Sequence, residues 1–228
     1  TKAVGKAVMS SYEYDLRNRL LKDISYETSL FDTLDVWDAR LASFAAVLIK
    51  TRASFLDRLS PFARETYAGI SGEKEALGLE YQSSLRCDTA RSIPEIEEQV
   101  LEDLRAHRGE DIRSRVTGLG PHRDDIAVTL DGNSARVFGS QGQQRSCVLA
   151  LKMAECEIIR ETIGEYPVVL LDDVMSELDA ARRDYLLNHL SGRQLIMTCC
   201  DRADFKHLTS GVSVKLEGGR VLTTRKYE

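Results

Sequence analysis

The feature that most constrains the fold is the stretch 168–179, which reads VVLLDDVMSELD. Its four apolar residues, Val168 to Leu171, are followed by two acids, a pattern typical of a strand buried on both faces of a parallel sheet. Ligands of open α/β sheets lie beyond the carboxyl ends of the strands. Asp172 and Asp173 are therefore predicted to lie at a binding edge. The alternative is a surface turn whose acids cap the next helix.

The chemistry expected at that edge is nucleotide binding. An apolar strand that ends in a carboxylate is how P-loop ATPases hold Mg²⁺ on a nucleotide phosphate, and a second acid often orients the attacking water. Two adjacent acids at a strand end point to different sides of a pocket. We therefore assign the Mg²⁺ ligand to Asp172 and the position of the catalytic acid to Asp173.

A second motif lies about thirty residues earlier, where residues 139–146 read GSQGQQRS and precede an amphipathic helical pattern. A small turn that contains glycine and runs into a helix leaves free backbone N–H groups at the positive end of the helix dipole, which is an anion site. The side chains of Ser140 and Gln143 add donors there, and Gly142 lets the backbone approach a ligand.

Together the two motifs resemble the signature loop, Walker B strand and D-loop of ABC-type ATPases, in the branch that includes the SMC proteins. A third string, GPHRDD at 120–125, is followed by the strand-like IAVTL. The three strings in this order resemble the RecF family of bacterial recombination mediators. The resemblance implies an α/β fold, namely a partial ABC-type P-loop ATPase lobe with an α-helical arm like an antiparallel coiled coil.

The resemblance also implies roles for individual residues. The signature residues, which grip the γ-phosphate of ATP held by the opposite subunit, correspond to Ser140, Gln141, Gly142 and Gln143. Asp179 resembles the D-loop acid that communicates across the dimer, and it is also placed to cap the helix of AARRDYL. ABC proteins commonly have a switch histidine after the next strand. This chain has Thr198 and Cys199 in that region, so no switch histidine is assigned.

Basic side chains in the first half are candidates to track DNA phosphates, although such charges more often form a solvated face. The candidates are Arg17, Arg19, Lys22, Lys50, Arg52, Arg58 and Arg64, of which Lys50 and Arg52 are put forward as DNA-binding together with Arg123. His122 and Arg123 otherwise have no assigned role beyond a basic pair near the nucleotide edge. An ion pair between Arg123 and Asp124 is an equal alternative.

Residues 1–115 are predicted to form the helical arm domain. A short basic helix is expected at 14–24, and a longer one at 34–59, capped by Thr33 and stopped by Pro61. The longer helix carries an apolar stripe of Leu34, Trp37, Leu41, Phe44, Leu48 and Phe55. A further helix opens at a capping box, Ser92 to Glu95, and should pair antiparallel with the long one. Residues 76–81 alternate like a strand.

Residues 116–228 are predicted to form the C-terminal half of the ATPase lobe. Strands are expected at 126–130 and 135–138 around a DGNS turn, followed by the signature helix to about residue 163. After the 168–171 strand come a helix at 180–190 and a buried strand at 194–200. Strands at 212–216 and 220–224 close the chain as a hairpin around Gly218 and Gly219. Strands that alternate with helices indicate an α/β layer architecture.

Composition excludes some classes of protein. No apolar run approaches the roughly 20 residues that a membrane helix needs, so the chain is expected to be soluble, cytoplasmic and without a membrane partner. Five cysteines without CxxC spacing favour neither a disulfide framework nor a zinc site. A net charge of -5 argues against indiscriminate nucleic-acid binding but still permits a local basic patch.

One family motif is missing from these 228 residues, because nothing in them matches the Walker A pattern GxxxxGK[ST]. RecF proteins carry that loop in a region before the part that this chain resembles. The chain is therefore expected to be a C-terminal portion of a longer protein. The intact family has a weak DNA-stimulated ATPase, whereas this chain alone is expected to be inactive.

The function implied by the resemblance is an ATP-dependent DNA-binding recombination mediator in DNA repair, DNA replication and the SOS response. Such a protein uses ATP and Mg²⁺, dimerises on ATP, and binds single-stranded DNA and gapped or junction duplex. Its partners are RecR and RecO, which it delivers to gaps. Two alternatives stay open: a non-catalytic interaction module, and a coiled-coil scaffold without nucleotide turnover.

Overall fold

The computed structural model describes residues 15–22, 33–174, 178–188, 193–200 and 210–227. Contacts divide the chain into two compact units: unit 1 is 1–57 with 79–127, and unit 2 is 58–78 with 128–228. Helix α2 (Leu34–Ser71), strand β1 (Leu77–Gln82) and strand β2 (Asp125–Leu130) each contribute residues to both units. The division into an arm to residue 115 and a half-lobe from residue 116 stays a prediction.

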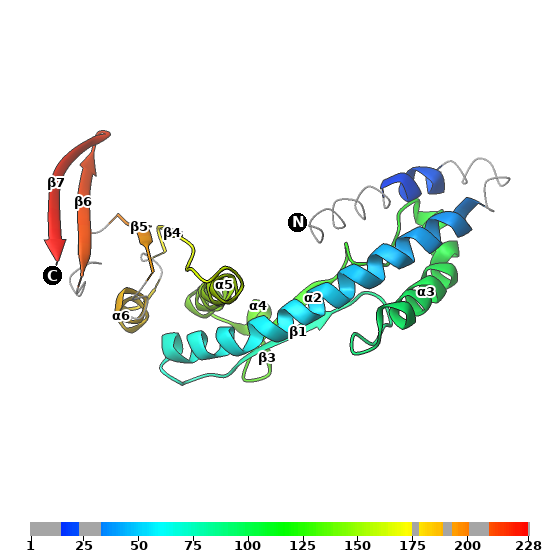
Figure 1. Ribbon diagram of the computed structural model, residues 1–228, viewed down its shortest axis with the longest axis horizontal. Helices are drawn as coiled ribbons and strands as arrows, with labels where there is room; N and C mark the ends of the chain where they lie inside the picture. The colour runs from blue at the N-terminus through cyan, green and yellow to red at the C-terminus, as the bar shows by residue number, and fades with distance from the viewer. Residues whose placement is uncertain (1–14, 23–32, 175–177, 189–192, 201–209, 228) are drawn as a thin grey trace. The chain divides into compact units, whose positions relative to one another are not determined.

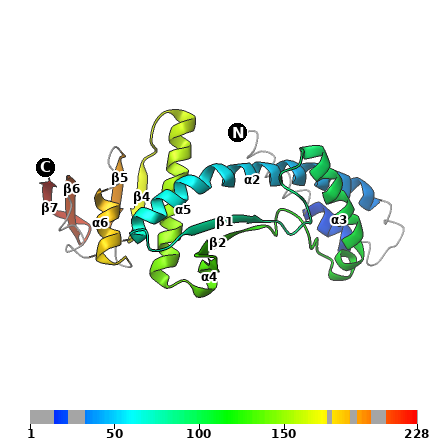
Figure 2. The same ribbon diagram turned by 90° about the horizontal axis from the view of Figure 1, so that it is seen from below.

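Unit 1 contains an antiparallel helix pair, in which α3 (Ile93–Ser114) packs against the first half of α2 (Figure 2). Arg108, near the end of α3, donates to Asp38 near the start of α2 at 2.7 Å. Lys50, farther along α2, donates to the carbonyl of Thr89, just before α3, at 2.8 Å. These contacts at opposite ends confirm the predicted antiparallel pairing.

The capping box predicted at the start of α3 is confirmed. The backbone N–H and the hydroxyl of Ser92 both donate to the carboxylate of Glu95, at 2.9 and 2.6 Å. These hydrogen bonds hold the pKa of Glu95 below its usual value. The predicted strand before α3 is confirmed as β1.

The core of the helix pair contains more alanine than the predicted stripe. Its buried members are Leu41, Ala42, Ala45, Ala46, Ile49, Leu85, Ile96, Val100 and Leu104. Leu34 and Leu41 are buried as predicted, but Phe55 is 43% exposed. Small alanine side chains let two helices approach closely, so the buried face of α2 follows its alanines rather than its largest apolar residues.

Helix α2 does not end before Pro61 as predicted, but continues to Ser71. Because a proline has no N–H, Pro61 cannot donate a hydrogen bond to the carbonyl four residues before it. A proline in a helix interior destabilises the helix by about 3 kcal/mol. Burial on both sides of the proline offsets that cost, because Leu59 before it and Ala63 and Tyr67 after it are all buried.

A buried ion network joins the first helix to the helix pair in unit 1. Residues 15–22 are helical, and Arg17 within them is fully buried. Its guanidinium donates to Asp38 and Asp111 at 2.7 Å each and to Thr117 at 2.8 Å. Arg17 therefore has no access to DNA phosphate, which corrects that prediction. The other part of the predicted helix, residues 14, 23 and 24, lies outside the described residues.

Strands β2 and β3 (Asn133–Ser134) form a tight antiparallel hairpin, in which Thr129 lies opposite Ser134. Asp131 and Gly132 turn the chain with φ of 49° and 80°, which suits the mirror-image turns of two-residue hairpins. The strand predicted at 135–138 is wrong, because these residues form the short helix α4 (Ala135–Phe138).

Residues 135–138 form a helical turn rather than a strand because their two large apolar side chains have little surface to pack against among the described residues. Val137 and Phe138 are 70% and 75% exposed, so neither side chain gains from lying on a sheet. The side-chain amide of Gln144 instead donates to the carbonyls of Arg136 and Gly139, which stabilises the helical turn. A run of four residues is too short for its pattern of apolar and polar side chains to distinguish a strand from a helical turn.

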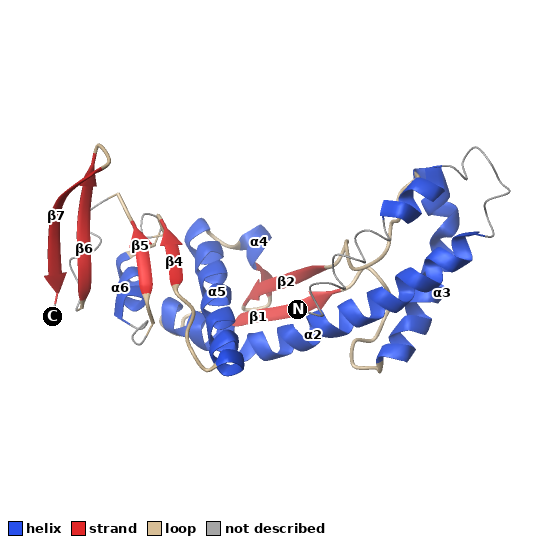
Figure 3. Ribbon diagram, turned by 45° about the horizontal axis from the view of Figure 1, so that its top comes forward, coloured by secondary structure: helices blue, strands red, loops and turns tan. Residues whose placement is uncertain are grey.

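Unit 2 then runs through α5 (Gln141–Ile163), β4 (Val169–Asp172), α6 (Ala180–Asn188) and β5 (Leu195–Thr198). Strands β4 and β5 pair in parallel, with Leu170 opposite Ile196 and Asp172 opposite Thr198 (Figure 3). The signature helix ends as predicted, where Gly164 takes φ of 89° and its N–H donates to the carbonyl of Arg160. Residues 189–192 lie outside the described residues, so the predicted end of α6 is not tested.

The apolar pattern predicts burial of β4 and β5 on both faces within a complete sheet, whereas in the described residues one face of the pair is open. Val169 and Leu171 are buried, whereas Leu170 and its register partner Ile196 are 71% and 53% exposed. Side chains alternate across a strand, so the exposed pair lies on one face of this two-stranded sheet. The same face carries Asp172 and Thr198, two residues further along their strands.

The closing hairpin is confirmed as β6 (Gly211–Glu217) and β7 (Arg220–Tyr227), the last two strands in Figure 1. Gly218 and Gly219 form its turn with φ of 57° and 75°. Within the described residues, no helix is long and apolar enough to cross a membrane.

Candidate nucleotide-binding site

The predicted signature loop forms the capped start of α5. Ser140 is the N-cap residue, and its hydroxyl oxygen accepts from the N–H of Gln143 at 3.3 Å. The side-chain carbonyl of Gln143 reaches back to accept from the N–H of Ser140 at 2.7 Å. This reciprocal pair is a capping box, which fixes the first turn of the helix.

The box determines which donors remain for a ligand. The first N–H groups of a helix have no intrahelical acceptor. The capping box uses the N–H of Gln143, and the N–H of Gln144 donates to the carbonyl of Ser140 at 2.9 Å. The N–H groups of Gln141 and Gly142 and the hydrogen of the Ser140 hydroxyl are then the donors that the box does not use. Three donors at the positive end of a helix dipole suit a phosphate.

Gly139 fits the turn before α5 because it has no side chain. Its N–H donates to the carbonyl of Ala135 at 3.0 Å, and a Cβ on Gly139 would lie only 2.4 Å from that carbonyl oxygen. A larger residue would therefore displace the backbone that leads into Ser140. The glycine of the motif has a local steric reason, independent of any ligand.

One N–H of the Gln143 side-chain amide already has a partner, and donation by this side chain to a ligand stays a prediction. Its side-chain nitrogen donates to Glu75, on the segment between α2 and β1. The other oxygen of Glu75 accepts from the hydroxyl of Tyr67 at 2.6 Å. Sequence reasoning missed Glu75 and Tyr67, because the string SGEKE showed only a turn and no spacing connects residue 75 to residue 143.

Thr198 contacts both residues of the predicted Walker B pair, Asp172 and Asp173. The Thr198 hydroxyl donates to Asp172, the last residue of β4. The same oxygen accepts from the N–H of Asp173 at 3.1 Å. Asp173 itself has φ of 49°, a left-handed conformation that non-glycine residues seldom adopt. One hydroxyl thus fixes both a carboxylate and the backbone that follows it.

Thr198 occupies the region in which no switch histidine could be assigned from the sequence. Its contact with Asp172 follows from the parallel register, which places the two residues opposite each other. The sequence contained both strands, but their register could not be read from it. The carboxylate of Asp172 is exposed on the open face of the sheet and has an oxygen to offer to a cation.

Asp179 caps helix α6, which confirms one of the two readings of this residue. Its carboxylate accepts from the N–H of Arg182 at 2.9 Å, and its carbonyl accepts from the N–H of Arg183 at 3.0 Å. The role of Asp179 in communication across a dimer stays a prediction. Among the described residues, Asp172 makes no hydrogen bond or ion pair with the loop 140–143.

Comparison with known proteins places this chain in a family. No protein-family model matches the chain. The DNA replication and repair protein RecF of Acetivibrio thermocellus is 38% identical over 221 residues, 92% of this chain and 60% of the relative. RecF of Ruminiclostridium cellulolyticum is 39% identical over 225 residues, 94% of this chain and 60% of the relative. Over the region that it spans, this chain belongs to the RecF family.

Two solved RecF structures also match, and both are described as the recombination mediator protein RecF in the RecFOR pathway, one with ATPrS and one with ATP. Their TM-scores are 0.82 and 0.79 at 33% identity, and the match covers 96% and 98% of this chain and 58% of each RecF chain. The predicted α/β fold class is confirmed. The chain spans about 60% of the length of the RecF proteins described here.

The string GPHRDD at 120–125 forms a hydrogen-bonded turn in unit 1. His122 Nε2 lies 3.0 Å from the carbonyl of Thr117. Asp124 accepts from the hydroxyl of Tyr81 and from the N–H and hydroxyl of Ser84, at 2.8 and 3.0 Å for Ser84. The alternative pairing of Asp124 with Arg123 is not among the ion pairs of the described residues. Burial raises the pKa of Tyr81, so this phenol stays a neutral donor.

The DNA-binding candidates of this RecF-family chain have partners within unit 1. Lys50 donates to the carbonyls of Thr89 and Ala90, and Arg52 donates to the carbonyl of Pro121 at 2.5 Å. Arg123 is exposed, and its N–H closes the turn that starts at Gly120. These contacts give Lys50 and Arg52 structural roles, whereas contact of any of the three with DNA stays a prediction.

Proposed function

We propose that this chain is part of an ATP-dependent DNA-binding recombination mediator that acts in DNA repair and replication. The observation that supports this most strongly is the start of α5, where two backbone N–H groups and one hydroxyl remain as donors at the positive end of a helix. The RecF relatives match 92% and 94% of this chain, and one solved RecF structure is described as RecF with ATP.

The proposed nucleotide site is shared between subunits. Ser140, Gln141 and Gly142 donate to the γ-phosphate of ATP that another subunit holds. Asp172 binds Mg²⁺ through the carboxylate that Thr198 orients, which fits the usual holding of Mg²⁺ by one or two carboxylates together with phosphate oxygens. Asp173 orients the attacking water. Bound Mg²⁺ supplies charge stabilisation for the transferred phosphoryl group.

The proposed partners are those of a recombination mediator. ATP-dependent homodimers of the intact protein bind single-stranded DNA and gapped or junction duplex, and they deliver RecR and RecO to gaps during gap repair and the SOS response. Support comes from the relatives, which are DNA replication and repair proteins, and from the RecFOR pathway named for the solved structures. In this proposal the protein acts on DNA in the cytoplasm.

Gln141 offers a sharp test of the loop in the complete protein that carries this chain. Gln141→Pro removes the N–H of the first helical position, where proline is well tolerated. The preceding Ser140 has φ of -62° and ψ of 160°, the extended conformation that a residue before proline requires. The matched control is Gln141→Ala, which keeps the N–H.

We expect ATP-driven dimerisation, measured as molar mass by light scattering, to weaken at least tenfold for Gln141→Pro, because a hydrogen bond to a charged group contributes about 1.5–3 kcal/mol and each dimer contains two such sites. Gln141→Ala should dimerise like the wild type, and both variants should have the wild-type thermal stability. Equal dimerisation of the proline and alanine variants would exclude this N–H as a phosphate donor.

A further inference from the structure

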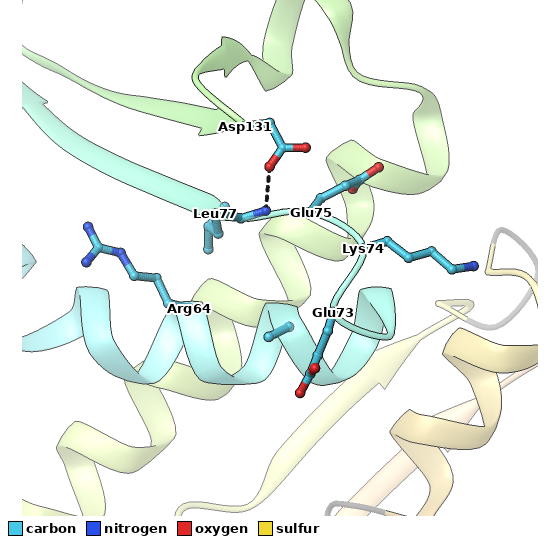
Figure 4. Close-up of a pocket in the computed structure, with 8 residues that line it drawn as sticks. Arg64, Glu73, Lys74, Glu75, Leu77 and Asp131 are labelled. Carbon is cyan, nitrogen blue, oxygen red and sulfur yellow. Dashed lines mark hydrogen bonds between the residues drawn. The ribbon is translucent and has the colours of Figure 1, made fainter.

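Glu75 holds the signature loop from outside the motif. Its carboxylate stands between the hydroxyl of Tyr67 on α2 and the side-chain nitrogen of Gln143 on α5. All three residues belong to unit 2. The segment that carries Glu75 is fixed by its neighbour. Ala76 donates its N–H to Asp131 at 2.9 Å, the dashed line in Figure 4. The carbonyl of Ala76 accepts from the N–H of Asp131 at 3.0 Å.

The contact with Glu75 decides which way the amide of Gln143 faces. A side-chain amide has a carbonyl oxygen on one side and an NH₂ group on the other, and only the oxygen can accept from the N–H of Ser140. A carboxylate accepts hydrogen bonds but cannot donate them. Glu75 therefore attracts the NH₂ side and leaves the oxygen for Ser140, which is the orientation found.

Packing alone does not hold this amide in place. A cavity of about 300 Å³ borders Gln143 and Glu75, so the side chain has room to rotate away from Ser140. Tyr67 is fully buried, and burial raises the pKa of its phenol, which keeps it a neutral donor to Glu75. The buried hydroxyl thus fixes the carboxylate, and the carboxylate fixes the amide.

We propose that Glu75 is a positioning residue for the nucleotide-binding loop, acting through Gln143 on the capping box of Ser140. This inference rests on the proposed function, because it gives the loop its role toward ATP. Without Glu75 the amide samples both orientations, the N–H of Ser140 loses its acceptor for part of the time, and the donors of Gln141 and Gly142 lose their fixed placement.

The contact can be tested by exchanging the amide and the carboxylate between positions 143 and 75. Gln143→Glu keeps an acceptor for the N–H of Ser140, since glutamate serves in a capping box as well as glutamine does. It also places a second carboxylate against Glu75, and two like charges repel. The double variant Glu75→Gln with Gln143→Glu restores an amide facing a carboxylate, with the two groups exchanged. Glu73→Gln is the matched control, because Glu73 is an exposed acid on the same segment.

Two measurements distinguish the hydrogen bond between Glu75 and Gln143 from its effect on ATP turnover. The first is amide hydrogen exchange over residues 140–144 in this chain without nucleotide, with residues 150–158 of α5 as an internal reference for folding. The second is ATP turnover by the complete protein that carries the same substitutions. Gln143→Glu should exchange roughly fivefold faster in the loop, as expected for the loss of one hydrogen bond, and should turn over more slowly.

The double variant should return both exchange and turnover toward the wild type, and Glu73→Gln should change neither. If amide hydrogen exchange over residues 140–144 stays as fast in the double variant as in Gln143→Glu, the proposed contact between Glu75 and Gln143 is refuted. Rescue of exchange without rescue of turnover would overturn the positioning role while leaving the contact intact. A wild-type protein that neither binds nor hydrolyses ATP would refute the proposed function, and the exchange result would still stand by itself.

Discussion

At the scale of single residues, two side chains outside the recognised motifs organise those motifs. Thr198 connects both Walker B acids through one hydroxyl, and Glu75 fixes the side chain of Gln143. Neither residue could be found from spacing, because each contact joins segments far apart in the chain. The motif residues Ser140 and Gln143 can be picked out from the sequence, since they lie in a glycine-containing turn that runs into a helix, but the capping box that joins them is seen only in the structure.

Removal of the Thr198 hydroxyl tests the Walker B geometry. Thr198→Val has nearly the same shape but takes the donor from Asp172 and the acceptor from the N–H of Asp173. We expect Mg²⁺-dependent ATP affinity of the complete protein to fall by up to about thirtyfold, since each of the two hydrogen bonds contributes about 1 kcal/mol. Thr198→Ser keeps the hydroxyl and should retain most of the affinity.

The measurement is a nucleotide titration with and without Mg²⁺. An equal loss of affinity in both conditions would show that Thr198 acts on folding rather than on the metal-binding carboxylate. The same conclusion would follow if the valine and serine variants behaved alike.

At the scale of helices and strands, local signals were reliable and long-range ones were not. The predicted start of α3 at Ser92 is correct, because a cap is a contact over three residues. Helix α5 instead begins at Gln141, inside the string 139–146 that the sequence predicts as a turn before the helix. Pro61 was read as a helix end, yet burial of Leu59 and Tyr67 keeps α2 helical across it. Residues 135–138 were read as a strand, yet Gln144 stabilises them as a turn of helix.

The capping box of α3 gives a prediction for pH. Hydrogen bonds from Ser92 lower the pKa of Glu95 from its ordinary value of 4.5. A carboxylate with a lowered pKa in the folded state stabilises the protein above its unfolded pKa, and this contribution is lost as the pH falls through the folded value. Glu95→Gln keeps an acceptor oxygen for Ser92 but has no charge to titrate.

The free energy of unfolding in urea should therefore be higher for the wild type than for Glu95→Gln at pH 7. The difference should shrink below pH 4.5 and vanish once Glu95 is protonated in the folded protein. Other carboxylates titrate equally in both proteins, so the difference isolates Glu95. A constant difference over the whole range would mean that the charge of Glu95 has no part in the cap.

At the scale of the whole molecule, the family and the α/β class could be predicted from three short strings, and the comparisons confirm both. Burial could not be predicted to the same degree. The run Val168 to Leu171 is as apolar as a strand buried on both faces, yet Leu170 is 71% exposed, because burial depends on which segments cover each face. Sequence composition describes a strand's own residues and not its neighbours.

The central claim is that the loop of Ser140 to Gln143 acts on a nucleotide bound by another subunit. Two variants of the complete protein, each defective in a different half of the composite site, test it directly. Gln141→Pro lacks a loop donor, and Asp172→Asn lacks the Mg²⁺ carboxylate. Each alone should have little ATP turnover, because every site in such a dimer contains one defect.

The deciding measurement is the turnover of an equal mixture of these two variants. If the loop acts between subunits, half of the dimers are mixed, and each mixed dimer has one site with both parts intact. The account predicts recovery to roughly a quarter of the wild-type rate. Turnover of the mixture that stays at the level of the separate variants would contradict it.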